Sequence, residues 1–455
     1  MKKLQLLILN CLIIVLSSCD SFLDIVPDDI ATIDNAFTMR AQAEKYLFTC
    51  YYYLPAHGLL EANPAIAGGD ELYITESFRS AAHVHAWYIS HNMQSSARPR
   101  CDYWTGADQQ NNKSLYQGIS DCNIFLENIQ KVPDMTQAEK DRWAAEVRFL
   151  KAYYHYWLIR MYGPIPIMDQ NIPVNAGEEE VKVFRNTIDE CFDYVTNILT
   201  EIIDSNHLPD KIMNEAEELG RITQGIAMAI RAEVMVTAAS PLFNPTNDRN
   251  LWHRAAVANK ELIDNCVAAN MSLINDYSAL WSATSHRTAL SELIFGRRAT
   301  RTTNSFEGYN FPVGLENCNG GNCPTQTLVD AYEMQATGLR PDETSGYDPA
   351  QPYYEGRDPR FYLTIAKNGD ENWPSWNDTP LQIYQGGVNA EPLSGATPTG
   401  YYLKKYCQAA IDLRASTSSA DYHTWITFRL GEFYLNYAEA VFKYFELGGN
   451  STAAD

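Results

Sequence analysis

Residues 136–164 read TQAEKDRWAAEVRFLKAYYHYWLIRMYGP, and this stretch of the sequence predicts the fold class. Thr136 and Glu139 have the spacing of a capping box, which favours the start of a helix. Gly163 and Pro164 then favour its end. Apolar side chains recur between these two points at steps of three or four residues, at Trp143, Val147, Leu150, Tyr154, Trp157 and Met161. We therefore predict a helix over 136–161, with Trp143, Tyr154 and Trp157 in the core.

Further segments show the same helical period. They are residues 115–129, 188–202, 223–239, 252–268 and 425–447. Successive helices of about 17–25 residues predict stacked helical hairpins of the tetratricopeptide type, although a clean repeat of about 34 residues is not visible. The predicted fold is mainly α, an α/α superhelix with a few short strands.

Two regions interrupt the helical pattern. Residues 63–111 mix Gly, Pro and Ser with aromatic residues, and residues 297–424 are polar and rich in Gly, Pro and Asn. Residues 361–366 form a short apolar run that suits a brief strand. Because long irregular segments in a compact protein usually bind something, we expect a loop-rich ligand-binding region here.

The start of the chain predicts export. Lys2 and Lys3 precede a short apolar run over residues 4–16, and Leu-Ser-Ser then leads to Cys19. This is the form of a bacterial lipobox, so we expect residues 1–18 to be a signal peptide and Cys19 to carry the lipid. An ordinary secretory signal beside an unrelated cysteine is the alternative. The chain has no later run of 18 apolar residues, so the lipid is the expected membrane anchor.

Charge and aromatic content narrow the function. The net charge is −21, and it becomes −23 once Lys2 and Lys3 leave with the signal. Such an acidic chain is a poor match for nucleic acid. The 28 Tyr and 9 Trp favour a wet binding surface, because these side chains combine an apolar face with a polar edge.

Eight cysteines remain after Cys11 and Cys19 are set aside. Cys318 and Cys323 flank Asn-Gly-Gly-Asn, where a turn is easy, so the sequence allows a local disulfide between them. Cys122, Cys191 and Cys266 lie in amphipathic patterns and are expected to be buried thiols. No His or Cys pair has metal spacing near these residues, so we expect no metal or other cofactor.

Catalysis has little support in the sequence. Asp70, Glu71, Asp358 and Glu371 are candidate glycosidase carboxylates, but acidic residues are common enough here for such pairs to arise by chance. Asp358 and Arg360 more plainly suit local capping of the backbone. The chain has no nucleophile elbow, no zinc-protease motif and no phosphate loop. We therefore expect no enzyme.

Seven short sequence motifs, spread along almost the whole chain, carry a family resemblance when they are taken together and in order. They are CDSFLD (19–24), AEVRFLKAYY (145–154), YGPIP (162–166), AASPLFN (238–244), PTQTLVDAYE (324–333), DPRFY (358–362) and RLGEFYLNYAEA (429–440). In these segments the chain resembles the SusD/RagB family, the nutrient-binding outer-membrane lipoproteins of Bacteroidetes. The match covers almost the whole chain. The resemblance implies an N-terminal region over 19–220, central helical pairs over 221–290 and a C-terminal region over 291–455.

The resemblance also implies a function. The protein would be lipid-anchored to the outer membrane, facing the exterior, and would capture an oligosaccharide for a SusC-like TonB-dependent transporter. The alternative is the capture of peptides, as in RagB-like members. A glycoside hydrolase is the less favoured reading. Family members usually continue past the last of these helices, so the resemblance implies a chain cut short at its end, with Tyr437, Val441 and Phe445 partly uncovered.

Family binding sites use aromatic side chains from the irregular regions, with polar side chains between them. By region, the resemblance therefore suggests a ligand-binding set. It consists of Arg79, Trp87, Tyr88, Asn92, Trp104, Tyr309, Asn310 and Phe311, with Arg98 nearby. The alternative for each aromatic residue is a packed anchor of its own loop.

Overall fold

The computed structural model describes residues 33–55, 69–75, 84–106, 113–212, 218, 220–281, 291–298, 302–344 and 354–450. Cys19, Arg79 and the signal peptide lie outside these residues. The longer helices are α3 (Arg40–Tyr51), α6 (Leu115–Asn128), α7 (Gln137–Tyr162), α8 (Ile188–Ser205), α10 (Gln224–Ala239), α11 (Arg249–Ala268) and α16 (Leu430–Glu446). Shorter helices are α2 (Ile33–Ala36), α5 (Val84–Ser90), α13 (Ser305–Asn310), α14 (Gln326–Ala331) and α15 (Pro359–Thr364). Three single 3₁₀ turns are η3 (Ile129–Lys131), η4 (Tyr277–Leu280) and η6 (Pro341–Glu343).

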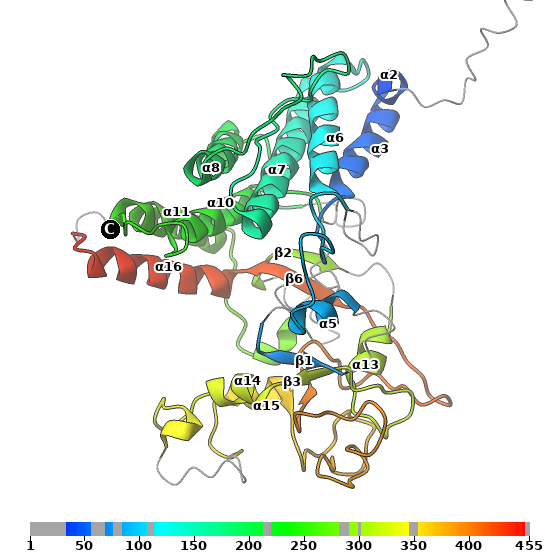
Figure 1. Ribbon diagram of the computed structural model, residues 1–455. Helices are drawn as coiled ribbons and strands as arrows, with labels where there is room; N and C mark the ends of the chain where they lie inside the picture. Colours follow the sequence, from blue (N-terminus) through cyan, green and yellow to red (C-terminus); the bar gives the residue numbers. More distant parts are fainter. Residues whose placement is uncertain are drawn as a thin grey trace, which may run out of the picture.

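The long helices stack in chain order. Each long helix contacts the next one along the chain, in the order α3, α6, α7, α8, α10, α11 and α16. Figure 1 shows this helical scaffold in the upper half of the view, with the loop-rich region beneath it. The predicted class, mainly α with a scaffold of the tetratricopeptide type, is confirmed.

Helix α7 forms as its sequence predicts. Thr136 accepts a hydrogen bond from the backbone N–H of Glu139, and the Glu139 carboxylate accepts one from the N–H of Thr136. Gly163 ends the helix with φ of +69°, a backbone conformation that glycine adopts without steric cost. Trp143, Tyr154 and Trp157 are buried, so their predicted place in the core is confirmed.

A buried ion pair joins α7 to the segment that precedes α10. Glu146 is fully buried in α7, and its carboxylate accepts hydrogen bonds from Arg221 Nη2 at 2.8 Å and Arg221 Nε at 3.0 Å. Arg142 and Tyr51 also donate to it, at 3.1 and 2.7 Å. Burial raises the pKa of the Glu146 carboxyl, and the attraction of Arg221 opposes that rise.

Three two-stranded antiparallel sheets organise the rest of the described chain. They pair β1 (Leu72–Ile74) with β3 (Asn322–Pro324), β2 (Leu293–Arg298) with β6 (Thr424–Arg429), and β4 (Ile365–Ala366) with β5 (Tyr402–Leu403). In the first sheet Tyr73 lies opposite Cys323. This sheet therefore joins the two irregular regions through strands that lie more than 200 residues apart in the sequence.

Two predicted elements are wrong in detail. Residues 425–429 belong to strand β6 rather than to the last helix, because they pair with β2 from Leu293 onward. The run at 361–366 is also mostly helical. Asp358 caps α15, accepting the N–H of Arg360 at 2.8 Å, and only Ile365 and Ala366 are extended.

Helix α16 packs on α11 along one side only. Ala440 and Tyr444 are buried against Trp252 and its neighbours, and Tyr437 and Val441 pack beside them half-buried. Phe445 on the same helix keeps 40% of its surface exposed, as predicted for that residue.

Candidate functional site

The first irregular region contributes a short helix, α5, whose end is fixed by backbone hydrogen bonds. The N–H of Met93 donates to the carbonyl of Tyr88 at 2.8 Å, and the N–H of Asn92 donates to that of Ile89 at 3.0 Å. Asn92 takes the left-handed conformation, with φ of +54°. This is the Schellman arrangement, which asparagine tolerates better than most residues. The exposed Asn92 side chain is therefore held beside the helix end.

An aromatic ring of α5 stacks on the ring of His91, the residue that follows the helix. Trp87 stacks on His91 with 4.0 Å between ring centroids and 22° between ring planes. His91 Nδ1 donates to the carbonyl oxygen of Trp87 at 2.8 Å, which fixes the imidazole against the indole. Tyr88 meets Trp87 edge-on, at 5.3 Å and 85°. The imidazole covers one face of the indole, so a ligand has at most the opposite face.

A guanidinium group completes this surface. Arg100 lies over the ring of Tyr88, 3.9 Å from its centroid, which is a cation–π contact. Its backbone N–H donates to Gln94 Oε1 at 3.2 Å. Its Nε is buried and has no hydrogen-bond partner among the described residues. Arg100 therefore brings a donor group next to the aromatic rings.

The second irregular region reaches the same place through Tyr309. This side chain, from α13, packs with Ile89 of α5 against Ile74 of β1. Tyr73 of β1 lies 6.2 Å from the ring of His91. Figure 1 shows α5, β1 and α13 close to one another between the helical scaffold and the loop-rich region. We call Tyr73, Trp87, Tyr88, His91, Arg100 and Tyr309 the α5 cluster.

Two residues of the predicted set do not face solvent. Phe311 is fully buried and meets Trp373 edge-on at 5.5 Å. Asn310 is also fully buried. Its Nδ2 donates to the Phe306 carbonyl at 2.8 Å, and its Oδ1 accepts from Asn322 Nδ2 at 2.7 Å. The prediction that these two side chains bind ligand is wrong for this structure, because core neighbours enclose both.

Trp104 packs against the scaffold. Its ring meets Tyr116 and Tyr162 edge-on, at 4.9 and 5.3 Å, rather than the aromatic rings of α5. Its backbone N–H donates to the hydroxyl of Tyr162 at 3.2 Å. The alternative of a packed loop anchor describes it better than ligand stacking. Arg98, named beside the set, lies in a tight turn with Ser95.

The predicted disulfide between Cys318 and Cys323 is absent, and both residues are free thiols. Cys323 is buried in β3 and donates to the Gly320 carbonyl at 3.4 Å. Cys318 donates to a different carbonyl, that of Glu316, at 3.2 Å. The turn between them therefore directs the thiols to separate local acceptors. Cys122, Cys191 and Cys266 are buried, as predicted.

The described residues give the acidic side chains local roles. Asp358 caps α15 and pairs with the guanidinium of Arg360, which confirms the predicted capping and lowers the pKa of that carboxyl. No group of three or more His, Cys, Asp and Glu in the described ranges is placed to hold a metal ion.

Two models of known protein families match this chain. Residues 22–236 match a family model described as starch-binding associating with outer membrane, and residues 291–455 match the model of the SusD family. Together the two models cover most of the chain. The chain belongs to the SusD/RagB family.

Relatives share the fold at low sequence identity. A curated SusD-like protein of Bacteroides ovatus is 22% identical over 363 residues, 75% of this chain. The chain spans 55% of the length of that relative. A SusD-like protein of Bacteroides fragilis has a solved structure with a TM-score of 0.71 and 23% identity, covering 94% of this chain and 79% of its own. The solved structure of a SusD-like carbohydrate binding protein of the same species has a TM-score of 0.67 and 19% identity. The match covers 90% of this chain and 75% of that protein.

The irregular regions carry the residues that sequence reasoning missed. Tyr73, His91 and Arg100 of the α5 cluster were outside the predicted set. His91 follows Trp87 by four residues, and that spacing is the one signal in the sequence that links them.

In the described part of this SusD/RagB chain, no helix is long and apolar enough to cross a membrane.

Proposed function

We propose that this protein is a cell-surface lipoprotein that binds oligosaccharide and holds it at the α5 cluster. Membership of a family whose model is described as starch-binding supports the ligand class. A solved relative described as carbohydrate binding supports it as well. The observation that carries the proposal is the supported indole of Trp87, with Tyr88 and the Arg100 guanidinium beside it.

The chemistry of the α5 cluster suits a sugar. A pyranose ring exposes a face of C–H groups, which packs on an aromatic ring, and its hydroxyl groups need hydrogen-bond partners. The face of Trp87 opposite His91 supplies the aromatic surface. Arg100 supplies N–H donors, and the exposed Asn92 side chain adds an amide. Catalysis plays no part in this proposal, in which the ligand leaves unchanged.

Anchoring and partner follow from the chain's start and its family. We propose that Cys19 carries the lipid, that the anchor lies in the outer membrane, and that the protein faces the exterior. The family description of association with the outer membrane supports this. A tether raises the effective concentration of a captured ligand near its recipient. We propose that the recipient is a SusC-like TonB-dependent transporter.

The test uses the chain from Asp20 onward on a glycan array and, in parallel, on a peptide library. We expect retention of one glycan class, no retention of peptides and no new reducing ends after incubation with that glycan. Trp87→Ala should weaken glycan binding at least tenfold. Tyr384→Ala is the matched control, because Tyr384 is an exposed aromatic residue outside the α5 cluster. Retention of peptides alone would replace the proposal with peptide capture, and new reducing ends would indicate an enzyme.

A further inference from the structure

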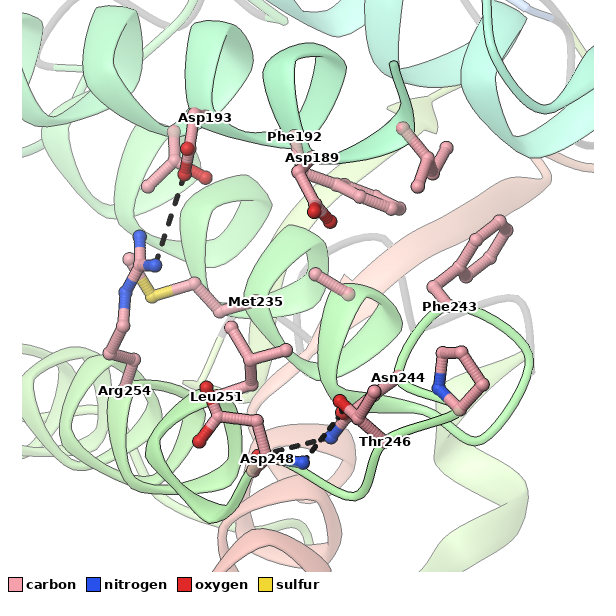
Figure 2. A pocket seen from close by; sticks show the side chains of 14 residues that line it. Asp189, Phe192, Asp193, Met235, Phe243, Asn244, Thr246, Asp248, Leu251 and Arg254 are labelled. Atoms are coloured by element: carbon pink, nitrogen blue, oxygen red, sulfur yellow. Dashed lines mark hydrogen bonds and ion pairs between the residues drawn. The ribbon is translucent and has the colours of Figure 1, made fainter.

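A cavity lies within the helical scaffold, apart from the α5 cluster. Its volume is about 420 Å³, and its walls come from α8, α10, α11 and the loop before α11. Figure 2 shows Asp189 and Asp193 of α8 on one side, with Asp248 and Arg254 on the other. The size falls within the range of about 300–1,000 Å³ that is usual for small-ligand pockets. The cavity shares no lining residue with the α5 cluster.

Helix periodicity places four cavity residues on one face of α8. Asp189, Phe192, Asp193 and Thr196 are spaced at i, i+3, i+4 and i+7, and all four line the cavity. The opposite wall includes Ala238, Phe243 and Asn244 from the AASPLFN segment, which the proposed glycan site leaves without a role.

Internal hydrogen bonds hold that opposite wall. Asn244 is buried, and its Nδ2 donates to the carbonyl oxygens of Ala239 and Asp248, at 3.3 and 3.0 Å. Its Oδ1 accepts the N–H of Asp248 at 2.7 Å. Asp248 in turn caps α11, accepting the N–H of Asn250 at 2.9 Å. The loop is therefore held in place before any ligand arrives.

The interior of the cavity is apolar and its rim is acidic. Phe192 and Phe243 meet edge-on at 5.1 Å, and Met235 and Leu251 lie beside them. The rim carries the carboxylates of Asp189, Asp193 and Asp248 against one lining cation, Arg254. Arg254 is 3.9 Å from Asp193, and both side chains are about half exposed, so that ion pair is weak. In the described part of the chain, Asp189 forms no ion pair.

Thr196 gives an independent sign that the cavity accepts a polar group. Only 5% of the surface of this residue is exposed, and it lines the cavity. The hydroxyl has no hydrogen-bond partner among the described residues. Because Thr196 lines the cavity, its hydroxyl oxygen is available to accept a hydrogen bond from a ligand there.

We propose that this cavity binds a guanidinium or ammonium group carried on an apolar stem. The stem lies against Phe192, Phe243 and Met235. The cationic head donates hydrogen bonds to Asp193, Asp189 and the Thr196 hydroxyl oxygen, and it displaces Arg254 from Asp193. An arginine or lysine side chain of a partner polypeptide has this chemistry, and so does a free alkylguanidine. Anions are disfavoured because carboxylates outnumber cations at the rim.

The test follows the methyl group of Met235 by NMR in the mature chain, labelled with ¹³C-methyl methionine and purified in detergent. The Met235→Leu variant assigns the signal. The probes are butylguanidinium and the peptide acetyl-Leu-Arg-Leu-amide. Butylurea and the citrulline peptide are their uncharged matches. We expect the charged probes to shift the Met235 signal, with an affinity that falls as salt rises, and the uncharged ones to leave it unchanged.

Three variants test whether the carboxylates and the Thr196 hydroxyl are responsible. The Asp189→Asn, Asp193→Asn double variant should lower the affinity at least tenfold. The Glu201→Gln, Asp204→Asn double variant should not, although it changes the charge of α8 by the same amount. Thr196→Val keeps the shape and removes the hydroxyl, so it should weaken binding several-fold even where the double variant fails to fold.

The outcomes separate the sources of the ligand. A response to the peptide alone points to a partner polypeptide, and a response to butylguanidinium alone points to a free amine. Responses to both support the shared chemistry. No shift with either charged probe, equal shifts with the uncharged matches, or full affinity in both Asp189/Asp193 and Thr196 variants would overturn the proposal. The glycan array reads a different surface, so failure of either proposal leaves the other standing.

Discussion

The indole of Trp87 lies nearly flat on the imidazole of His91, with 4.0 Å between the ring centroids. His91 directly follows the end of α5, four positions after Trp87, and its hydrogen bond to the Trp87 carbonyl fixes the imidazole in place. A short helix at the edge of a loop region holds its side chains loosely on its own. The stacked pair therefore gives the proposed ligand surface a rigid aromatic face.

Removing the imidazole should weaken ligand binding. In the His91→Ala variant Trp87 loses its stacking partner, and such ring pairs contribute about 0.5–1.5 kcal/mol. We expect the affinity for the glycan identified on the array to fall about three- to tenfold, as measured by isothermal titration calorimetry.

The control for this variant is His207→Ala, because His207 is exposed and lies between α8 and α10, outside the α5 cluster. It should bind as tightly as the unmodified protein. Unchanged affinity in His91→Ala, with weaker binding in Trp87→Ala, would show that the indole needs no support from His91.

Stability should depend strongly on Glu146. In Glu146→Gln the buried guanidinium of Arg221 loses its fully buried counter-charge and keeps only the partly exposed Glu218, 3.3 Å away. Breaking a buried pair typically costs about 3–5 kcal/mol. We expect the free energy of unfolding in urea to fall by about 3 kcal/mol or more.

Glu201→Gln is the matched control for that measurement. Glu201 also pairs with an arginine, Arg148, but its side chain is 64% exposed, and exposed pairs contribute about 0–1 kcal/mol. Similar losses in the two variants would mean that the Glu146–Arg221 pair contributes no more than a surface pair.

The scaffold was predictable because its signals are local. Thr136 and Glu139 fix the start of α7, Gly163 fixes its end, and the spacing of Trp143 and Trp157 fixes its buried side. Strand β6 lacks such a signal. Residues 424–429 run straight into α16, and they are extended because Leu293 and its neighbours pair with them from more than 100 residues earlier. A non-local partner overrides local pattern here.

The candidate site was predictable only by region. Trp87 and Tyr88 meet on α5, and Tyr309 reaches the same helix, because Tyr309 and Ile89 pack on Ile74. Phe311 follows Tyr309 by two residues and is nevertheless fully buried, because Trp373 from a distant loop covers it. Two residues this close together in an irregular segment thus differ in burial. Their exposure is set by contacts that composition does not reveal.

The cysteines offer a direct check on the loop at 318–323. With both thiols free, reduction should leave the mass of the alkylated, unfolded protein unchanged, and Cys318 and Cys323 should each carry one alkyl group. Burial raises the pKa of Cys323 to about 12, so in the native protein its alkylation should be slow. A two-proton mass deficit and a linked peptide containing both residues would contradict the structure.

Acid should destabilise the scaffold through His155, which is buried in α7. Its Nδ1 donates to the Lys151 carbonyl at 2.8 Å and its Nε2 accepts the N–H of Met168 at 3.2 Å, so the neutral ring satisfies both neighbours. Burial lowers the pKa of His155 to about 4, from about 6.5 in an unfolded chain. The hydrogen bond to the Lys151 carbonyl opposes that lowering of the pKa, the charge of the Lys151 ammonium adds to it, and the charge of Asp169 opposes it.

The sign of the pH effect follows from these values. Between pH 4 and pH 6.5 the unfolded chain binds more protons at His155 than the folded chain does, so stability rises with pH across this window. The contribution of His155 to the free energy of unfolding is fully present above pH 6.5. It is lost as the pH falls towards 4 and changes no further below pH 4. The shift corresponds to about 3 kcal/mol in all, of which about 2 kcal/mol should be lost by pH 5.

Urea unfolding at pH 7.5 and pH 5.0 measures this loss, and the His155→Gln variant isolates it. Glutamine can donate to the Lys151 carbonyl and accept from Met168 but does not titrate, so the variant should lose about 2 kcal/mol less than the unmodified protein between the two pH values. The comparison cancels groups that both proteins share. Among them is Glu432, whose pKa is raised to about 7 by burial and by Glu233. Equal losses in the two proteins would show that the imidazole of His155 titrates normally in the fold.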